Sequence, residues 1–384
     1  MTDPFGFESV SLQWLQHKPG VKWSRYPGTL AAWIADMDFP PAPAVLNALR
    51  NTTASGDFGY PNWRSGGSPA QRAFIARCAR RYGWQVELPQ LMELNDVVQG
   101  IQIVLHTSTQ PGDRVVVHTP AYPPMLHSVE DSGRELVRVP AQPSATSPSG
   151  WVFDHAALDA ELTARPAKAL LLCHPHNPTG HVFSPAELRE LAALAERHDL
   201  LIISDEIHAD LTYAPLAHQP IALFAPERSV TIHAASKAFN LAGLRYAIAH
   251  FGSVAAQLRV KELPHHLFGA PNVYGVMASA SAWNEGDEWL AAVMAHLDRN
   301  RHLLVSLLRG ALPTVGYHVP AGTYLAWLDC RALSFGDDPS RTFAARGVRL
   351  SEGPSFGHEG RGFARLNFAT SSAMLRSSVE RMAA

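Results

Sequence analysis

Residues 236–245 have the sequence Ser-Lys-Ala-Phe-Asn-Leu-Ala-Gly-Leu-Arg, which holds one lysine in an otherwise uncharged run that ends in arginine. The apolar residues 229–233 precede this run and predict a strand, and residues 244–251 predict a second strand beyond a glycine-bearing turn. Burial lowers the pKa of a lysine, and a neutral amine attacks carbonyls to form Schiff bases. Lys237 is therefore a candidate nucleophile, and the alternative is a lysine at a strand end with its amine in solvent.

The composition indicates a large globular protein that acts on a small molecule. The 384 residues are 46% hydrophobic and 17% charged, which provides enough apolar side chains for a large core divided between two domains. A formal net charge of -2, with scattered arginines, gives no positive field, so we expect neither nucleic acid nor membrane as a partner. The N-terminus lacks a basic segment followed by an apolar one, and we expect a cytoplasmic protein.

The cysteines and histidines do not form the patterns of a metal centre or a disulfide framework. Cys78, Cys173 and Cys330 are far apart, odd in number and mostly in apolar surroundings, which predicts buried thiols. Nineteen histidines are present, but the closest pairs lack the i, i+4 spacing of a helical zinc site. We therefore expect no metal.

Three apolar stretches predict strands, at residues 114–118, 169–173 and 200–204. A helix with leucines along one face is expected between the last two, over residues 185–198. Near-continuous apolar strands that alternate with helices predict a mostly parallel sheet covered by helices on both faces. In such sheets, ligands bind beyond the carboxyl ends of the strands.

A polar motif follows each of these strands. Tyr122 lies in Thr-Pro-Ala-Tyr-Pro-Pro, Asn177 in Asn-Pro-Thr-Gly and Asp205 in Asp-Glu-Ile-His-Ala-Asp. Because the carboxyl ends of parallel strands meet at one edge of the sheet, we expect these three side chains to converge with Lys237. Each has an ordinary alternative, as a loop aromatic, a turn residue and a helix N-cap, respectively.

Residues 96–105, Asp-Val-Val-Gln-Gly-Ile-Gln-Ile-Val-Leu, place a short polar turn with one glycine before an apolar helix. Free amides at a helix N-terminus bind phosphate well, so this is a candidate anion site. A plain helix start is the alternative.

The two ends of the chain predict a second structural unit. Residues 1–40 form an arm that is dense in aromatic and turn residues and has little helical periodicity. Residues 272–311 predict two helices, and β-like alternation follows at residues 322–329, 347–350 and 363–369. We expect a large α/β domain over residues 47–283. Residues 1–46 with 284–384 are expected to form the arm and a smaller α+β domain.

In order and context, Tyr122, Asn177, Asp205, Lys237 and Arg245 resemble the pattern of the fold-type I pyridoxal-phosphate enzymes, the aspartate aminotransferase superfamily. The resemblance covers nearly the whole chain. It implies an α/β fold of the PLP-dependent transferase type, with a mostly parallel central sheet sandwiched by helices and a smaller α+β domain. It also implies pyridoxal 5'-phosphate (PLP) as cofactor and an amino acid as substrate.

The resemblance implies a role for each candidate. Lys237 forms the Schiff base, Tyr122 stacks on the cofactor ring, and Asn177 and Asp205 bind its phenolate oxygen and ring nitrogen. The other implied cofactor contacts are Tyr60, Gly100, Ile101, Gln102, His208, Ser236 and Arg245. Arg365 and Ala35 are implied substrate contacts, Arg365 by gripping the α-carboxylate as a bidentate fork.

Two details qualify this pattern. Tyr60 is implied to reach the phosphate of a neighbouring subunit, which predicts a homodimer with shared active sites. The superfamily usually has Ser or Gly three residues before the lysine, where this chain has Ala234, and Ser236 is the nearest hydroxyl.

Longer matches point to one branch of the superfamily. Residues 33–39 (Trp-Ile-Ala-Asp-Met-Asp-Phe), 204–211 (Ser-Asp-Glu-Ile-His-Ala-Asp-Leu) and 239–244 (Phe-Asn-Leu-Ala-Gly-Leu) look like the bacterial C-S lyases of the MalY/PatB type. Those enzymes cleave cystathionine and related cysteine conjugates. We therefore expect a C-S β-lyase that forms a thiol, pyruvate and ammonia by α,β-elimination. An aminotransferase is the first alternative, and a regulatory binding protein that retains PLP is the second.

Overall fold

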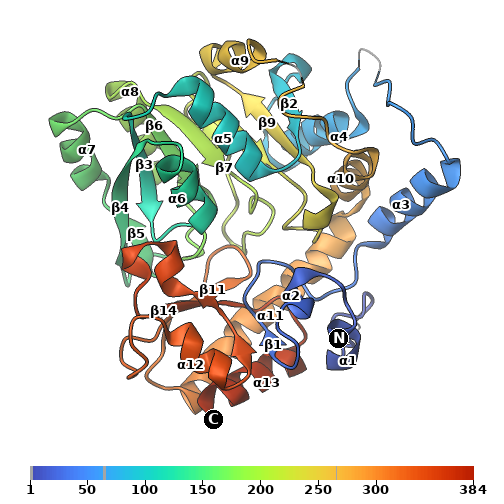
Figure 1. The fold of residues 1–384 in the computed structure, drawn as a ribbon, viewed down its shortest axis with the longest axis vertical. Helices are drawn as coiled ribbons and strands as arrows, with labels where there is room; N and C mark the ends of the chain where they lie inside the picture. The colour runs from blue at the N-terminus through green and yellow to red at the C-terminus, as the bar shows by residue number, and fades with distance from the viewer. Residues whose placement is uncertain (1–2, 64–65, 265) are drawn as a thin grey trace.

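The computed structural model describes residues 3–63, 66–264 and 266–384. Its larger sheet has eight strands in the order β2-β9-β8-β7-β6-β3-β4-β5 (Figure 1). Five of them run parallel: β4 (Glu135–Pro143), β3 (Arg114–Thr119), β6 (Ala169–Cys173), β7 (Leu201–Asp205) and β8 (Ser229–His233). At one edge, β5 (Trp151–Phe153) pairs antiparallel with β4. At the other edge, β9 (Ala247–Phe251) pairs antiparallel with both β8 and β2 (Leu91–Leu94), so β2 runs in the same direction as the five. The predicted mostly parallel sheet is confirmed.

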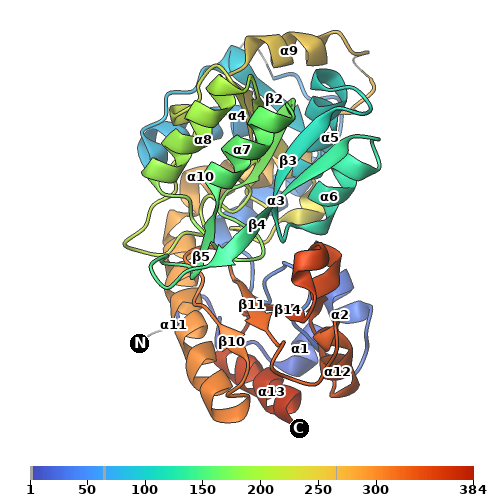
Figure 2. The ribbon, with the colours of Figure 1, turned by 90° about the vertical axis from the view of Figure 1, so that its left-hand side faces the viewer.

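Helices cover both faces of this sheet because its strands are apolar on both sides. Along β3, Val115 and Val117 belong to one apolar cluster and Val116 to another, as the alternation of side chains in a strand requires. The first cluster includes side chains of α5 (Val97–Ser108), α6 (Pro123–Glu130) and α9 (Val254–Lys261). The second includes those of α7 (His155–Ala164) and α8 (Pro185–Arg197). Figure 2 shows α7 and α8 on one side of the strands and α5 and α6 on the other.

A third group of helices packs beside β9. It contains α3 (Pro43–Ser55), α4 (Pro69–Arg77) and α10 (Val273–Glu285), and α4 continues into a π-helical turn, Cys78–Tyr82. Ser68 caps α4, with its side chain accepting from the Gln71 amide while the Gln71 side chain accepts from the Ser68 amide. This reciprocal cap fixes where the helix begins.

The smaller sheet is antiparallel, in the order β10-β11-β14-β13. Its strands are β10 (Gly316–Tyr317), β11 (Leu325–Asp329), β14 (Phe363–Asn367) and β13 (Ser351–Glu352). The helices of this region are α11 (Asp287–Ala311), α12 (Pro339–Ala345) and α13 (Ser372–Ala383), and α11 packs on α13. Short 3-10 turns lie at Leu88–Gln90, Ile221–Leu223, Ala242–Leu244, Gly353–Phe356 and His358–Gly360.

The N-terminal arm joins this smaller part of the molecule. Strand β1 (Leu30–Ala31) pairs in parallel with β12 (Val348–Arg349), and Figure 1 shows the arm beside α11 and α13. The arm also contains two short helices, α1 (Leu12–Gln16) and α2 (Val21–Ser24), which the sequence did not predict because neither is long enough to show a periodic apolar face. The domain boundaries at residues 46 and 283 stay a prediction.

None of the helices in the described ranges combines the length and apolar composition that crossing a bilayer requires.

Candidate active site

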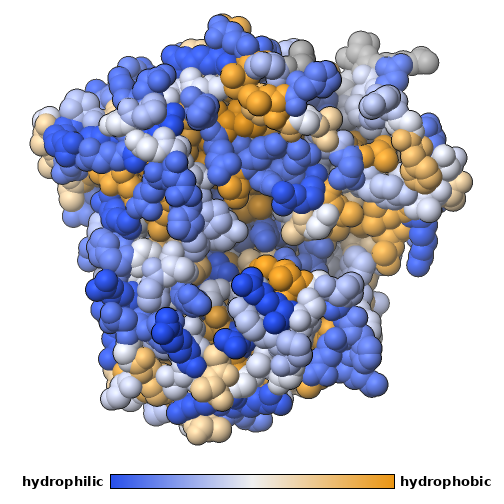
Figure 3. All heavy atoms as spheres, viewed as in Figure 1, coloured by the Kyte–Doolittle hydropathy of each residue, from blue (hydrophilic) through white to orange (hydrophobic). Residues whose placement is uncertain are grey.

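The predicted site residues gather where the parallel strands end and the smaller sheet begins. Figure 3 shows this face of the molecule hollowed between its upper and lower parts. Tyr122 is the N-cap residue of α6, in the loop after β3, and Asp205 is the last residue of β7. The Tyr122 phenol and the Lys237 amine both lie within electrostatic reach of Asp205 and Arg365. The expected convergence at the carboxyl edge of the sheet is therefore what the structure shows.

Lys237 points into the protein. Its Nζ donates a hydrogen bond to the Ala35 carbonyl at 2.9 Å and lies 3.9 Å from Asp36 Oδ1, and the side chain is 19% exposed. Burial lowers the pKa of the amine, the Arg365 charge lowers it further, and the Asp36 and Asp205 carboxylates raise it. A lowered pKa raises the fraction of neutral amine, the form that Schiff-base formation requires.

Asp205 is a buried acid that forms no ion pair with any of the described residues. It is 5% exposed, and its Oδ1 accepts only from the Ile207 amide, at 3.0 Å. Burial raises the pKa of this carboxyl to about 6, although nearby His233 and Lys237 oppose the rise. A buried carboxylate without an ion pair is stabilised by a cationic ligand, and a protonated ring nitrogen is such a cation. The helix N-cap alternative is excluded because no helix begins at this residue.

Arg365 on β14 is the matching buried cation. Its Nη1 donates to Asn177 Oδ1 at 3.0 Å, and its Nη2 donates to the Trp33 carbonyl and to Ser351 Oγ, each at 3.0 Å. Burial lowers its pKa to about 10, and its Nε has no hydrogen-bond partner among the described residues. No described carboxylate pairs with Arg365, so it is available to the carboxylate of a ligand.

The remaining residues of this group complete its chemistry. Asn177 accepts from Arg365 through Oδ1, and its Nδ2, which donates to none of the described residues, is available to an oxygen of a bound ring. Tyr122 is half-buried and burial raises the pKa of its phenol, so the ring stays neutral. His208 is buried, with its Nδ1 unpaired among the described residues, and burial beside Lys237 and Arg365 lowers its pKa to about 3. The His208 imidazole is therefore neutral.

The predicted phosphate cradle lies inside α5. Gly100, Ile101 and Gln102 are in the second turn of the helix, where the Gly100 amide donates to the Asp96 carbonyl at 3.2 Å. Gly100 is closely packed, since a Cβ there would lie 2.7 Å from Leu94 Cδ1. The phosphate contact of these three residues stays a prediction. Asp96 caps the helix by accepting from the Gln99 amide at 2.7 Å.

The amides that remain free at this helix start are those of Val97 and Val98, which have no acceptor among the described residues. Arg245 lies at the same place, with its Nη2 2.8 Å from Asp96 Oδ2. Two free amides beside an arginine are a candidate phosphate site. Counting amides from Asp96 as the N-cap would have identified Val97 and Val98 from the sequence. Ser236, directly before Lys237, is half-buried and its hydroxyl bonds to none of the described residues.

Tyr60 does not take part in the site of its own chain. Its side chain is fully exposed, at 104% of the reference area, on the loop after α3. Its predicted contact with a neighbouring subunit stays a prediction.

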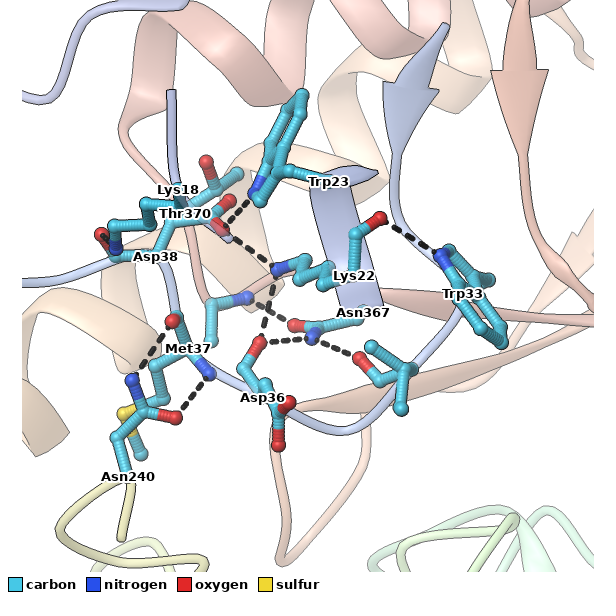
Figure 4. Close-up of polar contacts among 12 residues, drawn as sticks. Lys18, Lys22, Trp23, Trp33, Asp36, Met37, Asp38, Asn240, Asn367 and Thr370 are labelled. Atoms are coloured by element: carbon cyan, nitrogen blue, oxygen red, sulfur yellow. Dashed lines mark hydrogen bonds and ion pairs between the residues drawn. The ribbon is translucent and has the colours of Figure 1, made fainter. Parts of the chain in front are cut away.

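The sequence interpretation missed how the site is held together. We define the bridge segment as residues 33–38, whose backbone runs between Arg365 and Lys237. Its carbonyls accept from Arg365 at Trp33, from Lys237 at Ala35 and from Lys22 at Asp36. Asn240 clamps Met37 by accepting from its amide and donating to its carbonyl, both at 2.9 Å (Figure 4). Asn240 lies in the same loop as Lys237, so the clamp ties the lysine loop to the arm.

Comparisons with known proteins agree with this arrangement. The family described as aminotransferase class I and II matches residues 34–382. The chain is 32% identical to cystathionine beta-lyase of Corynebacterium glutamicum, over 97% of this chain and 98% of that protein. It is 31% identical to cystathionine beta-lyase PatB of Bacillus subtilis, over 95% and 96% of the two chains. The structure of the PLP-bound C-S lyase from Staphylococcus hominis superposes with a TM-score of 0.90, at 26% identity, over 98% and 97% of the two chains.

Proposed function

Because the chain belongs to the class I and II aminotransferase family, we propose that it is a PLP-dependent C-S β-lyase acting on cystathionine or related cysteine conjugates. The observation that carries the proposal is the placement of Lys237 near two buried charges, Asp205 and Arg365, which have no ion pair among the described residues. Asp205 suits a protonated ring nitrogen, and Arg365 suits the carboxylate of an amino acid. The names of the C. glutamicum and B. subtilis relatives favour the lyase within this family.

The residues present fit the cofactor. Bound PLP supplies a protonated conjugated ring that withdraws electrons from the substrate Cα. Asp205 would keep the ring nitrogen protonated, Asn177 Nδ2 would donate to the phenolate oxygen, and Tyr122 would stack on the ring. The Val97 and Val98 amides would bind the phosphate together with Arg245.

The chain's own residues then carry the elimination. Arg365 binds the α-carboxylate and fixes the orientation of the Cα–H bond. The Lys237 amine takes the Cα proton, the C–S bond at Cβ breaks with its electron pair on sulfur, and the thiolate is protonated as it leaves. With one water consumed, the remaining three carbons and the nitrogen become pyruvate and ammonia.

An aminotransferase is the second candidate, because the family description covers that activity and the same residues serve it. The two reactions differ in where the proton held by Lys237 is returned. Transamination needs a keto acid to complete each cycle, whereas elimination does not. Release of thiol with equal pyruvate from a cysteine conjugate, without keto acid, supports the lyase, and a strict keto-acid requirement contradicts it.

We also propose that the enzyme is a cytoplasmic homodimer with shared active sites. The fully exposed Tyr60 phenol contacts none of the described residues, and the neighbouring Phe58 is 62% exposed, which supports a second copy packing there. Cys78, Cys173 and Cys330 are all buried and free, which is typical of a reducing compartment.

A further inference from the structure

We propose that Asp36 binds the α-ammonium group of the amino-acid substrate, while Arg365 binds its α-carboxylate. This inference rests on the proposed function, because it names the second charged contact of the same substrate. It assigns a substrate-binding role to a residue of the bridge segment.

The Asp36 carboxylate is oriented but not neutralised by the rest of the protein. Its carbonyl accepts from Lys22 Nζ at 2.9 Å and from Asn367 Nδ2 at 2.7 Å, which fixes the backbone. Figure 4 shows the carboxylate directed away from both of these side chains. Within the described part of the chain, Lys237 at 3.9 Å is its one ionic contact, and the carboxylate accepts no hydrogen bond.

The second acid of the same segment has a different environment. Asp38 Oδ1 lies 2.9 Å from Lys22 Nζ, with the two side chains 2% and 5% exposed, and it also accepts from Trp23 Nε1 at 2.7 Å. Asp38 is therefore a structural acid that is already paired. Asp36 is 31% exposed and is open to a ligand.

Lys237 is only a temporary partner for Asp36. Once Lys237 Nζ is covalently bonded to a cofactor, it no longer presents a free ammonium group to the carboxylate. An incoming amino acid would have to bring its nitrogen close to Nζ, which lies 3.9 Å from Asp36 Oδ1. The substrate ammonium would then give Asp36 the cationic partner that Nζ no longer presents.

The position of Arg365 allows one substrate to contact Arg365 through its α-carboxylate and Asp36 through its α-ammonium group. The bridge segment contacts Arg365 through the Trp33 carbonyl and Lys237 through the Ala35 carbonyl, so both ends of the zwitterion face one short strand of backbone. Three residues span at most about 10 Å. That reach suffices for an amino-acid head group with a hydrogen bond at each end.

The test compares two ligands that differ only in the amino group. Isothermal titration calorimetry on the PLP-loaded enzyme measures Kd for α-methyl-L-norvaline, which has no Cα hydrogen to lose, and for 2-methylpentanoate. Asp36→Asn should weaken the amino acid about tenfold, as expected for loss of a charge-assisted hydrogen bond, and leave 2-methylpentanoate within about twofold. Asp36→Glu, which keeps the charge, should retain more of the amino-acid affinity than Asp36→Asn. Asp131→Asn removes an exposed charge elsewhere and should change neither affinity.

A second measurement follows the lysine and does not depend on turnover. The charged or titratable groups that face Lys237 within the described residues are Asp36, Asp205, His208, Arg365 and Tyr324, whose hydroxyl donates to the same Ala35 carbonyl. In the cofactor-free protein, Asp36→Asn should lower the Lys237 pKa, measured from the pH dependence of its reductive methylation. An unchanged Lys237 pKa, or equal weakening of both ligands by Asp36→Asn, overturns the inference. If the wild-type enzyme releases no thiol but the two affinities still separate, the lyase function fails and the role of Asp36 stands.

Discussion

Arg365 Nη1 and Asn177 Oδ1 are hydrogen-bonded at 3.0 Å, although 188 positions separate the two residues in the sequence. The bond joins strand β14 of the smaller sheet to the loop after β6 of the larger one. Arg365, which we propose binds the substrate, is thereby held by Asn177, which we propose binds the cofactor. The orientation of the substrate therefore depends on a residue that binds the cofactor.

Arg365→Lys should raise KM for a cysteine conjugate by about tenfold or more, with a smaller change in kcat. A lysine keeps the charge but cannot bond Asn177, Trp33 and Ser351 while offering a planar fork to a carboxylate. Steady-state kinetics measure this, with Arg361→Lys as the control because Arg361 is exposed. An unchanged KM in Arg365→Lys would show that the α-carboxylate binds elsewhere.

Borohydride reduction of the PLP-loaded protein should fix a pyridoxyl group on Lys237, since this amine is buried and its pKa is lowered. Peptide mapping by mass spectrometry identifies the labelled residue. Lys237→Ala should remain unlabelled, whereas Lys261→Ala, in the exposed end of α9, should be labelled as the wild type is. A pyridoxyl group on another lysine of the wild-type protein contradicts the assignment.

Asp205→Asn should stabilise the cofactor-free protein relative to wild type by an amount that grows as the pH rises from about 4 to about 6. The reason is that burial raises the Asp205 pKa from 3.8 to about 6, so the folded protein retains a proton there that the unfolded chain loses. Ionising the buried carboxyl costs about 3 kcal/mol by pH 7. Thermal unfolding of both proteins across this range measures the difference.

In the PLP-loaded enzyme, Asp205→Asn should be harmful, because PLP needs the ionised carboxylate at its ring nitrogen. Asp205→Asn is expected to reduce turnover by about 100-fold or more. Near-normal turnover in Asp205→Asn would refute its role at the ring nitrogen. A stability difference that does not change between pH 4 and 6 would refute the raised pKa.

The sequence predicted those features that depend on a single strand or a single motif. Apolar runs predicted β6 and β8 with correct bounds, and the polar residues after the strands indicated the shared edge at which Tyr122 and Asp205 lie. It was uninformative where a contact joins distant segments. Nothing local to Asn240 shows that its amide clamps Met37, 203 positions away, and nothing local to Lys22 shows that it supports the Asp36 carbonyl.

The start of α5 was read incompletely from the sequence. The prediction centred on Gly100, Ile101 and Gln102, and the structure adds the amides of Val97 and Val98, which have no acceptor among the described residues. The free amides belong to the first turn, which is defined by the N-cap Asp96 and not by the glycine.

Mixing Tyr60→Phe protein with Lys237→Ala protein should restore part of the activity, if Tyr60 completes the site of the neighbouring subunit. Each mixed dimer then holds one site with both native residues. The measurement is turnover after the two proteins are unfolded together and refolded, with heterodimers confirmed by mass spectrometry. Refolded single variants are the controls, and heterodimers without recovered activity rule out shared sites.

We propose that the enzyme eliminates and does not transaminate. The purified PLP-loaded protein is given L-cystathionine with no keto acid, and homocysteine, pyruvate and the cofactor absorbance are followed over many turnovers. The Lys237→Ala protein is the blank. We predict sustained release of homocysteine and pyruvate in equal amounts, because elimination returns the cofactor to its starting state. Reaction that stops after one turnover per site, resumes only when a keto acid is added and yields no pyruvate would contradict the account.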